Sequence, residues 1–387
     1  MNQLRATVRS VRPILLSHTY APGEELSWVG GTIRSWDAAL VEVTLTDGST
    51  GLGEAGAGIM AAQAVPGIVD ALRPYLDGVE FENPQAVGDH LRAYTAFWSR
   101  GGLLSGVIGA VETAILDAVG KRENAPAWQL LGGDGRPSIE AYASGGLGTT
   151  FDDISAWATQ QHKSGFGTVK FRAMRDPGTT IELLHHVTSH LPEGTQFIID
   201  AVQACASNPW PVEQAIEVGQ VAAQLGARWY EEPCQAEDVA GLARVRAAVD
   251  VPISGVESNA MVREFAELVA NQALDILQPD VSFVGGPTAF RRVAALAQAA
   301  GLQCVPHVWG SGVTFAANLH TVAATASVNL FEFCTLPNPL REALLLEPPR
   351  LVDGQVQIGR GAGLGVAVTA EIQAQFPFTA GGGHVIR

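Results

Sequence analysis

Three acidic residues end three short apolar runs near the middle of the chain. Asp200 ends the run 197–200, Glu231 ends 228–231 and Glu257 ends 251–257, so the acids lie 31 and 26 residues apart. These intervals match one strand-helix repeat, and parallel strands of one barrel would bring the three carboxylates to a single mouth. Carboxylates gathered in this way repel one another unless a cation lies between them. Hard oxygen ligands suit Mg²⁺, so the sequence predicts a magnesium site at these residues.

Other ionisable residues follow further apolar runs in the same part of the chain. Lys170 and Arg172 are two positions apart on one run, so both face the same side of a strand. Asp280, His307 and Glu332 end or follow three later runs. Each residue alone has an ordinary explanation, such as a solvated charge or a helix cap. Seven of eight predicted strands carry such groups at or near their ends, which indicates an active site.

This set of residues suits removal of a proton next to a carboxylate. The proton is weakly acidic because its loss creates a doubly charged enediolate, which a divalent cation stabilises where the charge develops. His307 is the predicted base, with Asp280 setting its tautomer and basicity. Lys170 or Arg172, together with a protonated Glu332, are expected to add hydrogen bonds to the enediolate.

The elements that must position these residues alternate regularly after Ser138. Helical segments separate the short strand-like runs, and this alternation predicts a (β/α)-barrel whose strand ends carry the chemistry. A doubly wound open sheet is the alternative, but no Gly-rich phosphate turn follows an early strand. The predicted strands are 139–143, 168–171, 197–200, 228–231, 252–255, 274–278, 303–306 and 329–333.

The first third of the chain has a different pattern. Strand-like alternation with a Thr-Asp-Gly turn at 46–48 is followed by helical periodicity from 61 to about 120, which predicts an α+β domain over residues 1–125. Two loops are expected at 18–33 and 53–60. The barrel domain is placed at 126–354, and the Gly-rich tail 355–387 is expected to return to the first domain.

Composition and charge narrow the class of protein. The chain has 387 residues and a net charge of −15, which disfavours partners that carry phosphates or anionic membrane surfaces. The four cysteines are far apart and form no CxxC, as in a reducing compartment. No signal peptide and no apolar stretch of membrane-spanning length are expected, so the predicted location is cytoplasmic.

The residues described above resemble those of the enolase superfamily, mandelate racemase subgroup. The resemblance covers nearly the whole chain, and its further carriers are Gly51-Leu52-Gly53-Glu54-Ala55, Leu130-Leu131-Gly132-Gly133, Glu231-Glu232-Pro233 and Gly285-Gly286. It implies a modified (β/α)7β barrel with an α+β N-terminal capping domain and a Mg²⁺ cofactor. It also implies that the capping loops contact substrate and that the protein is a homo-oligomer, either a dimer or an octamer. The expected substrate contacts are His18, Tyr20, Trp28, Met60 and Trp309.

Two positions differ from the common pattern of that subgroup. Arg172 stands where many members have a second lysine, and a guanidinium is a poor base, which disfavours a two-base racemase. Val202 stands where an asparagine is usual, so a polar contact is lost there.

The main prediction is therefore an acid-sugar dehydratase. Within the subgroup, the segments 305–313 and 338–341 resemble those of acid-sugar dehydratases and of a sugar-lactone cycloisomerase. In this reaction His307 takes the α-proton of a sugar acid and returns it to a departing β-hydroxyl. A sugar-lactone cycloisomerase, or a racemase or epimerase of a hydroxy acid, would use the same first half-reaction. A barrel that binds a metal and a ligand without turnover is the alternative from another class.

Overall fold

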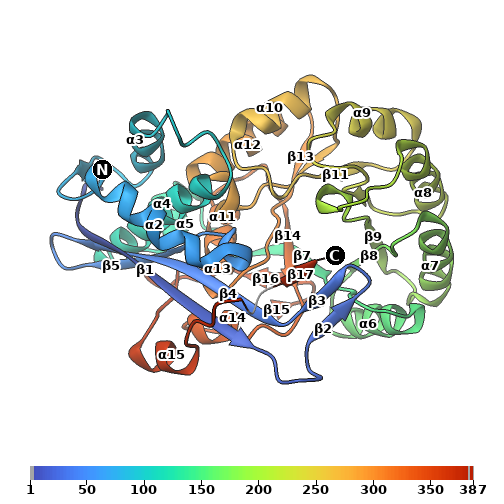
Figure 1. The fold of residues 1–387 in the computed structure, drawn as a ribbon, viewed down its shortest axis with the longest axis horizontal. Helices are drawn as coiled ribbons and strands as arrows, with labels where there is room; N and C mark the ends of the chain where they lie inside the picture. Colours follow the sequence, from blue (N-terminus) through green and yellow to red (C-terminus); the bar gives the residue numbers. More distant parts are fainter. Residues whose placement is uncertain (1–3, 382–383, 387) are drawn as a thin grey trace.

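The computed structural model describes residues 4–381 and the backbone of residues 384–386. An N-terminal sheet with its helices lies against one end of a barrel of strands and helices (Figure 1). Residues 1–3 of the expected capping domain, and residues 382–383 and 387 of the expected tail, lie outside the described residues.

The N-terminal part is built on an antiparallel sheet. β1 (Ala6–Thr19) and β4 (Ser35–Leu45) pair over most of their lengths, with Ile14 opposite Leu40. β5 (Thr50–Glu54) and the short β6 (Glu80–Phe81) complete the order β5-β4-β1-β6. The predicted turn joins β4 to β5, and its Gly48 has a φ of 94°, which glycine adopts without strain.

The helices of this part pack on the sheet around one long central helix, α4. Glycines allow β5 to lie directly against α4, because a Cβ at Gly53 would stand 1.9 Å from the Ala110 carbonyl oxygen. The Gly51-Leu52-Gly53 motif is therefore a packing requirement. The helices are α1 (Gly58–Ala61), α2 (Val65–Leu72), α3 (Ala86–Tyr94), α4 (Leu103–Arg122) and α5 (Ala127–Leu130), with 3-10 turns at Ala62–Ala64 and Arg73–Tyr75.

Helix α4 corrects one expectation about membrane-length segments. By length and composition it is apolar enough to span a membrane, and it is the one such helix in the described part of the chain. Inside the protein 94% of its apolar window is buried. Its hydrophobicity on all sides fits its position as a core helix, in contact with the cap sheet and with the barrel.

The predicted barrel is confirmed, and all eight expected strands are present. Neighbouring strands pair in parallel in the order β13-β12-β11-β10-β9-β8-β7, and β14 pairs with β7 on its other side. The central strands are shorter than predicted. The strands are β7 (Ser138–Ser144), β8 (Thr168–Arg172), β9 (Gln196–Asp200), β10 (Tyr230–Glu231), β11 (Ile253–Gly255), β12 (Ile276–Leu277), β13 (Gln303–Cys304) and β14 (Leu330–Cys334).

Helices surround these strands and separate one from the next. Several begin with a side-chain cap, for example α7, where Asp176 accepts a hydrogen bond from the Thr179 backbone N–H at 2.8 Å. The helices are α6 (Phe151–Lys163), α7 (Pro177–His190), α8 (Val212–Gln224), α9 (Val239–Ala248), α10 (Val262–Ala270), α11 (Val281–Val284), α12 (Pro287–Ala299), α13 (Gly312–Ala323) and α14 (Pro339–Leu344), with a 3-10 turn at Gln203–Cys205.

Large apolar side chains in or next to six of the strands fill the interior of the barrel below the site. The members of this buried cluster are Tyr142, Ile198, Trp229, Ile276, Val305 and Leu330. Because strand residues alternate in direction, Asp200 and Glu231, two residues after Ile198 and Trp229, point into the same interior. The polar groups therefore stand above a packed apolar floor.

The two expected capping loops contain more regular structure than predicted. The segment 18–33 includes the end of β1 and a small antiparallel hairpin of β2 (Leu26–Trp28) and β3 (Gly31–Ile33). The segment 53–60 includes the end of β5 and the start of α1. The polar and glycine-rich composition of 18–33 obscured the two short strands, which are three residues each.

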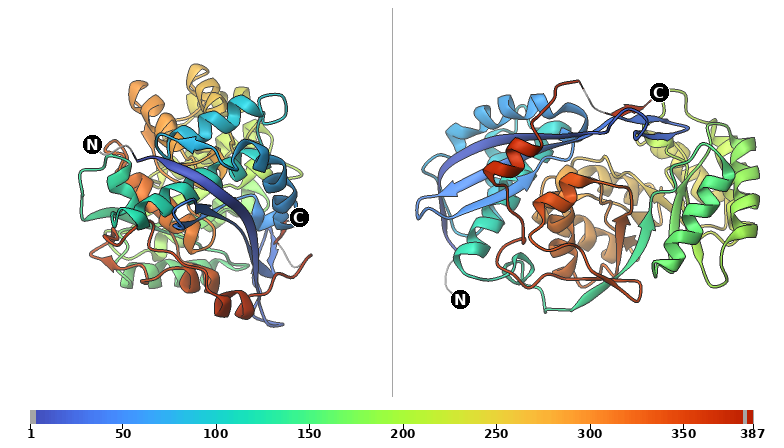
Figure 2. Two further views of the ribbon diagram at one scale, coloured as in Figure 1. Left: turned by 90° about the vertical axis from the view of Figure 1, so that its left-hand side faces the viewer. Right: turned by 90° about the horizontal axis from the view of Figure 1, so that it is seen from below.

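The C-terminal segment contacts both parts of the molecule. β15 (Leu351–Val352) and β16 (Gln355–Gln357) form a hairpin in which β16 pairs with β7 of the barrel. After α15 (Ala370–Gln375), the chain runs along β1 and β17 (His384–Ile386) pairs with β3 (Figure 2). The tail thus reaches the N-terminal sheet, while its first residues belong to the barrel sheet.

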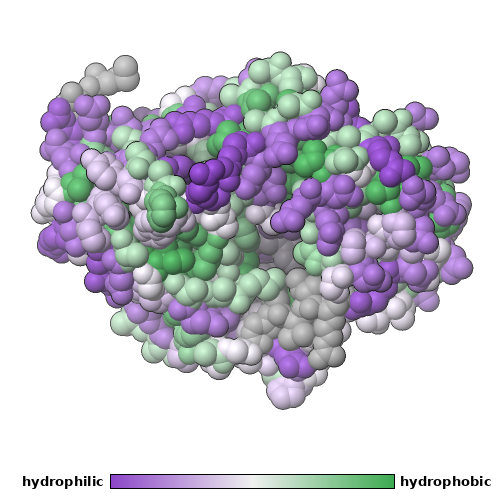
Figure 3. All heavy atoms as spheres, turned by 45° about the horizontal axis from the view of Figure 1, so that its top comes forward, coloured by the Kyte–Doolittle hydropathy of each residue, from purple (hydrophilic) through white to green (hydrophobic). Residues whose placement is uncertain are grey.

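The outer surface is mainly hydrophilic. On the face shown in Figure 3, hydrophilic residues surround a smaller hydrophobic area, and the surface is hollowed near the middle of the view. This distribution fits the acidic composition of the chain.

Candidate active site

A cavity of about 150 Å³ lies where the ends of the barrel strands face the N-terminal part. Four of the predicted functional residues line it: Arg172, Asp200, Glu257 and His307. They come from the ends of β8 and β9 and from the segments after β11 and β13. The structure therefore brings together, at one mouth, residues up to 135 positions apart in the sequence.

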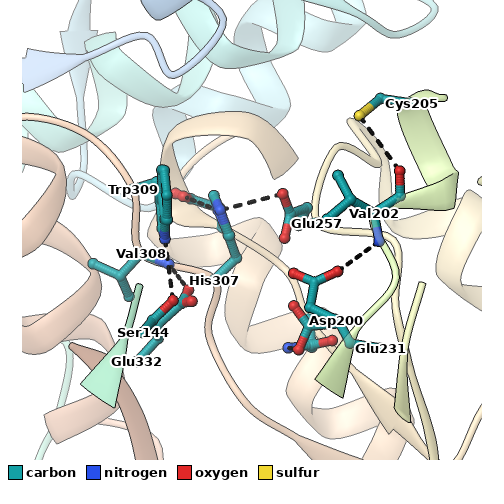
Figure 4. Close-up of polar contacts among 12 residues, drawn as sticks. Ser144, Asp200, Val202, Cys205, Glu231, Glu257, His307, Val308, Trp309 and Glu332 are labelled. Atoms are coloured by element: carbon teal, nitrogen blue, oxygen red, sulfur yellow. Dashed lines mark hydrogen bonds and ion pairs between the residues drawn. The ribbon is translucent and has the colours of Figure 1, made fainter. Parts of the chain in front are cut away.

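His307 and Asp280 form the predicted pair. His307 Nδ1 lies 2.9 Å from Asp280 Oδ2, and its Nε2 faces Glu257 Oε1 at 3.4 Å (Figure 4). Burial disfavours the charged imidazole, but Glu257 and Asp280 outweigh it and raise the pKa of His307 to about 9. A raised pKa makes the imidazole a stronger base once it is neutral.

Asp280 is held by residues that the sequence analysis did not identify. Its Oδ1 accepts hydrogen bonds from the Ser282 backbone N–H at 2.8 Å, the Ser282 hydroxyl at 2.7 Å and Asn318 Nδ2 at 3.0 Å. Its Oδ2 is left for His307. As expected of an acid in this position, Asp280 also caps the short helix α11. Asn318 lies 38 residues further on in α13, so spacing alone could not reveal it.

Lys170 stands at the centre of a buried ion cluster. It forms short ion pairs with Glu231 and with Glu332 Oε1, the latter at 2.8 Å. Burial opposes the charge on Lys170, but the two carboxylates outweigh this effect and raise its pKa well above the ordinary value. Lys170 is therefore an ammonium in this arrangement.

Glu332 corrects one expectation of the sequence analysis. Burial would raise its pKa, but Lys170 outweighs burial and lowers the pKa of Glu332 to about 2. Its Oε2 also accepts a hydrogen bond from the Val308 backbone N–H at 2.7 Å. Glu332 is therefore a carboxylate rather than the protonated donor that was expected, and it holds Lys170 and the chain after His307.

Arg172 and Asp200 form a second ion pair, next to the cavity. Arg172 Nε lies 3.2 Å from Asp200 Oδ2, and the guanidinium stacks over the Trp309 ring at 5.1 Å from its centroid. Arg172 Nη1 is buried without a hydrogen-bond partner. Burial opposes its charge, but Asp200 and other carboxylates raise the pKa of Arg172, so it is a permanent cation with one donor free for a ligand.

Two of the predicted magnesium ligands fit a hard cation well. Asp200 and Glu257 both line the cavity with carboxylate oxygens. Burial raises the pKa of Asp200 to about 7, although the charge of Arg172 acts to lower it. Burial likewise raises the pKa of Glu257, although His307 acts to lower it. Buried carboxylates whose charged form is disfavoured are stabilised when a cation binds to them.

The third predicted ligand, Glu231, is engaged elsewhere. It is the neighbour of Asp200 on the adjacent strand, but it is not among the residues that line the cavity. Its oxygens accept hydrogen bonds from Lys170, Trp229 Nε1 and Gln278 Nε2, the last two at 2.9 Å. Within the described part of the chain, no three His, Cys, Asp or Glu side chains are grouped as a metal site. To bind a cation here, Glu231 would have to contact the cation in addition to its hydrogen bonds with Lys170 and Gln278.

Glu232 is a further buried carboxyl group beside the site. Its backbone has a φ of 49°, and its Oε1 has no hydrogen-bond partner. Burial, together with Glu257 and Asp200, raises the pKa of Glu232 well above the ordinary value. Glu232 was not among the predicted site residues, because only Glu231 of the Glu231-Glu232-Pro233 motif was expected to bind the metal.

The predicted substrate-contact residues divide into two groups. Trp28, Met60 and Trp309 line the cavity. His18 and Tyr20 are not among the lining residues, and their expected contact with substrate stays a prediction. The Tyr20 hydroxyl donates to the Pro337 carbonyl oxygen at 2.5 Å and accepts from Trp36 Nε1 at 2.7 Å, and His18 packs edge-on against Tyr20.

Comparison with known proteins extends over both parts of the chain. The family described as enolase C-terminal domain-like matches residues 153–372. The family described as mandelate racemase / muconate lactonizing enzyme, N-terminal domain, matches residues 24–132.

Individual relatives align over most of their lengths. D-galactarolactone cycloisomerase of Agrobacterium fabrum is 31% identical over 352 residues, which are 87% of this chain and 90% of the relative. Arabinonate dehydratase of Saccharolobus solfataricus is 28% identical, over 84% of this chain and 87% of the relative. A crystal structure of a racemase from Streptomyces coelicolor with bound magnesium has a TM-score of 0.83 and 26% identity, and covers 95% of this chain and 99% of that chain.

The fold and the site thus define a capped-barrel enzyme with a His–Asp pair and buried carboxylates at the barrel mouth. The chain belongs to the enolase superfamily, in its mandelate racemase subgroup.

Proposed function

We propose that the protein is a Mg²⁺-dependent dehydratase of a hydroxylated carboxylic acid of the sugar-acid class. The observation that carries this proposal is the His307–Asp280 pair, in which His307 Nε2 lies 3.4 Å from Glu257 Oε1 at the cavity that Arg172, Asp200 and Glu257 line. One base beside a set of anion- and cation-binding groups suits removal of an α-proton. Its similarity to sugar-acid dehydratases, among them arabinonate dehydratase, supports the substrate class.

Asp200 and Glu257, with Glu231 next to Asp200, would hold the cation. When bound, Mg²⁺ supplies positive charge close to the substrate carboxylate, where the enediolate charge develops. Neutralisation of Glu257 by the cation would also remove the largest attraction that holds a proton on His307, so that more of the imidazole is neutral at ordinary pH.

The residues of the chain then carry out the proton transfers. His307 Nε2 takes the α-proton while Asp280 holds Nδ1 and stabilises the imidazolium that forms. The free Nη1 of Arg172 is placed to donate to a substrate oxygen, and Lys170 adds positive charge from below. The imidazolium returns its proton to the β-hydroxyl, the carbon–oxygen bond breaks and water leaves. The resulting enol becomes a 2-keto-3-deoxy acid.

A sugar-lactone cycloisomerase is the second candidate, and the similarity to D-galactarolactone cycloisomerase favours it. The same α-proton would be removed, but the leaving group would be the ring oxygen. The product would then have the same mass as the substrate.

Product analysis separates these candidates. Purified protein with Mg²⁺ is incubated with a library of mono- and diacid sugars and their lactones, and the products are measured by mass spectrometry. Loss of water supports the dehydratase, and an isobaric product supports the cycloisomerase. A library left unchanged, with no exchange of the α-proton in D₂O, would refute both reactions and support a protein that binds without turnover.

The metal proposal can be tested without measuring activity. Mg²⁺ at 100 times its dissociation constant should stabilise the folded protein by about 2.7 kcal/mol. Thermal denaturation should show this rise in Tm for the wild type and lose it in Asp200→Asn and Glu257→Gln. Glu237→Gln, which removes an exposed carboxylate, is the matched control. A rise in Tm that is unchanged in both site variants would place the cation elsewhere.

A further inference from the structure

Few of the residues that line the catalytic cavity are polar, and their number limits which hydroxy acids the cavity can accept. Its charged groups, Arg172, Asp200, Glu257 and His307, are the ones that the reaction uses. The other side chains that line it are apolar, apart from one cysteine. We propose, on the basis of the proposed function, that the substrate is a deoxy or anhydro sugar acid, whose part remote from the carboxylate carries few free hydroxyl groups.

The wall contributed by the N-terminal part is apolar except for one donor, the indole N–H of Trp28. It consists of Trp28 of β2, Ile33 of β3, and Ile59 and Met60 of α1. Met60 has 54% of its surface exposed in this structure, so it is an apolar group presented to the entrance. A ligand that covers these side chains gains stability by burying its own apolar surface.

The wall contributed by the barrel is equally apolar. Leu147, Val202 and Phe283 line it beside Trp309. The indole N–H of Trp309 donates to the Ser144 hydroxyl at 3.4 Å and its ring covers Arg172, so it has no spare donor for a substrate. Burial raises the pKa of the nearby Cys205 thiol to about 12, which keeps it a weak neutral group.

Val202 is one of three residues that line both this cavity and a second one. The second cavity has a volume of about 310 Å³, is lined by polar residues such as Gln203, Ser207 and Asn208, and shares Trp28, Val202 and Cys205 with the first. Figure 4 shows Val202 between the Asp200 carboxylate and Cys205. A longer, fully hydroxylated acid would have to pass these residues to reach polar partners.

The backbone of Val202 supports a specific role for this side chain. Its φ is 53°, a left-handed conformation that is strongly disfavoured for a β-branched residue. Its N–H donates to Asp200 Oδ1 at 2.8 Å, which fixes the backbone next to a proposed metal ligand. Strained residues of this kind cluster at functional sites. Asparagine tolerates this conformation better, so valine is held here at a cost in local stability.

Discrimination should follow from the cost of burying a hydroxyl without a partner. An apolar pocket rejects an analogue that adds one hydroxyl by up to about 100-fold. The test compares pairs of acids that differ only in one distal hydroxyl, such as L-rhamnonate with L-mannonate and D-fuconate with D-galactonate. A further pair is 3,6-anhydrogalactonate with galactonate, in which ring closure removes two free hydroxyls. The readout is kcat/KM for exchange of the α-proton in D₂O with Mg²⁺.

In at least one pair, the less hydroxylated acid should exchange its α-proton with a kcat/KM about 10- to 100-fold higher. Equal rates, or a faster hydroxylated partner, would overturn the inference while leaving the proposed function intact. Absence of exchange for every acid, the hydroxylated ones included, would refute the proposed function and the inference with it.

Two variants at one position separate polarity from space. Val202→Asn adds an amide in a conformation that asparagine tolerates, and should shift the preference toward the hydroxylated partner by about tenfold. Val202→Ala adds space without a polar group and should keep the preference for the less hydroxylated acid. An equal shift in both variants would show that volume, and not the apolar wall, decides the substrate.

Discussion

The proposed base depends on how its acid partner is held. Asp280 gives Oδ2 to His307 only because Ser282 and Asn318 occupy Oδ1. Asn318 is fully buried, and its side-chain oxygen accepts the Val281 backbone N–H at 3.1 Å. It is therefore a positioning residue that acts on His307 through Asp280.

Asn318→Ala should lower kcat by about tenfold with little change in KM, because Asp280 can then rotate away from His307 while the ligand contacts remain. Thr321→Val is the matched control, since Thr321 is buried one turn further along α13 and bonds only to the Ala317 carbonyl. Steady-state kinetics with a Tm for each variant checks this. A KM effect, or an equal loss of kcat in the control, would contradict the positioning role.

At the scale of elements, two acids of the N-terminal part bind the starts of barrel helices. Glu54, at the end of β5, accepts hydrogen bonds from the Ser311 hydroxyl at 2.5 Å and the Thr314 backbone N–H at 2.9 Å at the start of α13. Glu112 of α4 accepts the Thr288 backbone N–H at 2.8 Å in the first turn of α12. The contacts of Glu54 tie the segment that carries Trp309 to the cap.

Loss of Glu54 should therefore affect catalysis as well as stability. Glu54→Ala should destabilise the fold by about 1–2 kcal/mol and lower kcat/KM by about tenfold or more, because the segment after His307 loses its anchor. Asp176→Ala removes the cap of α7 at the surface and should cost stability alone. Chemical denaturation and kinetics of both variants check this, and similar losses of activity in the two would refute the coupling.

Glu112 makes stability depend on pH. Burial raises the pKa of Glu112 from 4.5 to about 7, so the folded protein holds this proton more tightly than the unfolded chain. The stabilisation from Glu112 is present below pH 4.5 and is lost as the pH rises through about 7, by at most about 3 kcal/mol.

Glu112→Gln should consequently raise Tm at pH 8 and leave it nearly unchanged at pH 5. Thermal denaturation of the variant at the two pH values checks the sign, with the exposed Glu82→Gln as the control. A variant that loses stability at pH 8 would show that the charged form of Glu112 is the stabilising one, through Arg92.

The eight barrel strands could be predicted because short apolar runs alternate with helical segments, and seven of the eight carry an ionisable residue at or near the end. Contacts that depend on how helices pack on the barrel could not be predicted. Asn318, for example, reaches Asp280 only because α13 packs beside it. The charge of Glu332 depends on its 2.8 Å distance from Lys170, which a sequence does not specify. The position of His18 at the end of β1 and the hydrogen bond from Trp36 to the Tyr20 hydroxyl also depend on the folded chain.

At the scale of the whole molecule, both the cap and the barrel contribute residues to the site. The barrel supplies the charged groups, and the N-terminal part closes them under apolar side chains. The C-terminal tail pairs with β3, the strand next to Trp28, and so joins the two parts again. The expected homo-oligomer, a dimer or an octamer, stays a prediction that light scattering can check.

The central claim is that His307 removes the proton next to a substrate carboxylate. The most direct measurement follows the α-proton of an accepted acid by NMR in D₂O with Mg²⁺, for the wild type and His307→Asn. The wild type should replace the proton with deuterium, and the variant should lose this exchange while still binding the acid in calorimetry. Retained exchange in His307→Asn would contradict the account and move the base to the Lys170 side of the barrel.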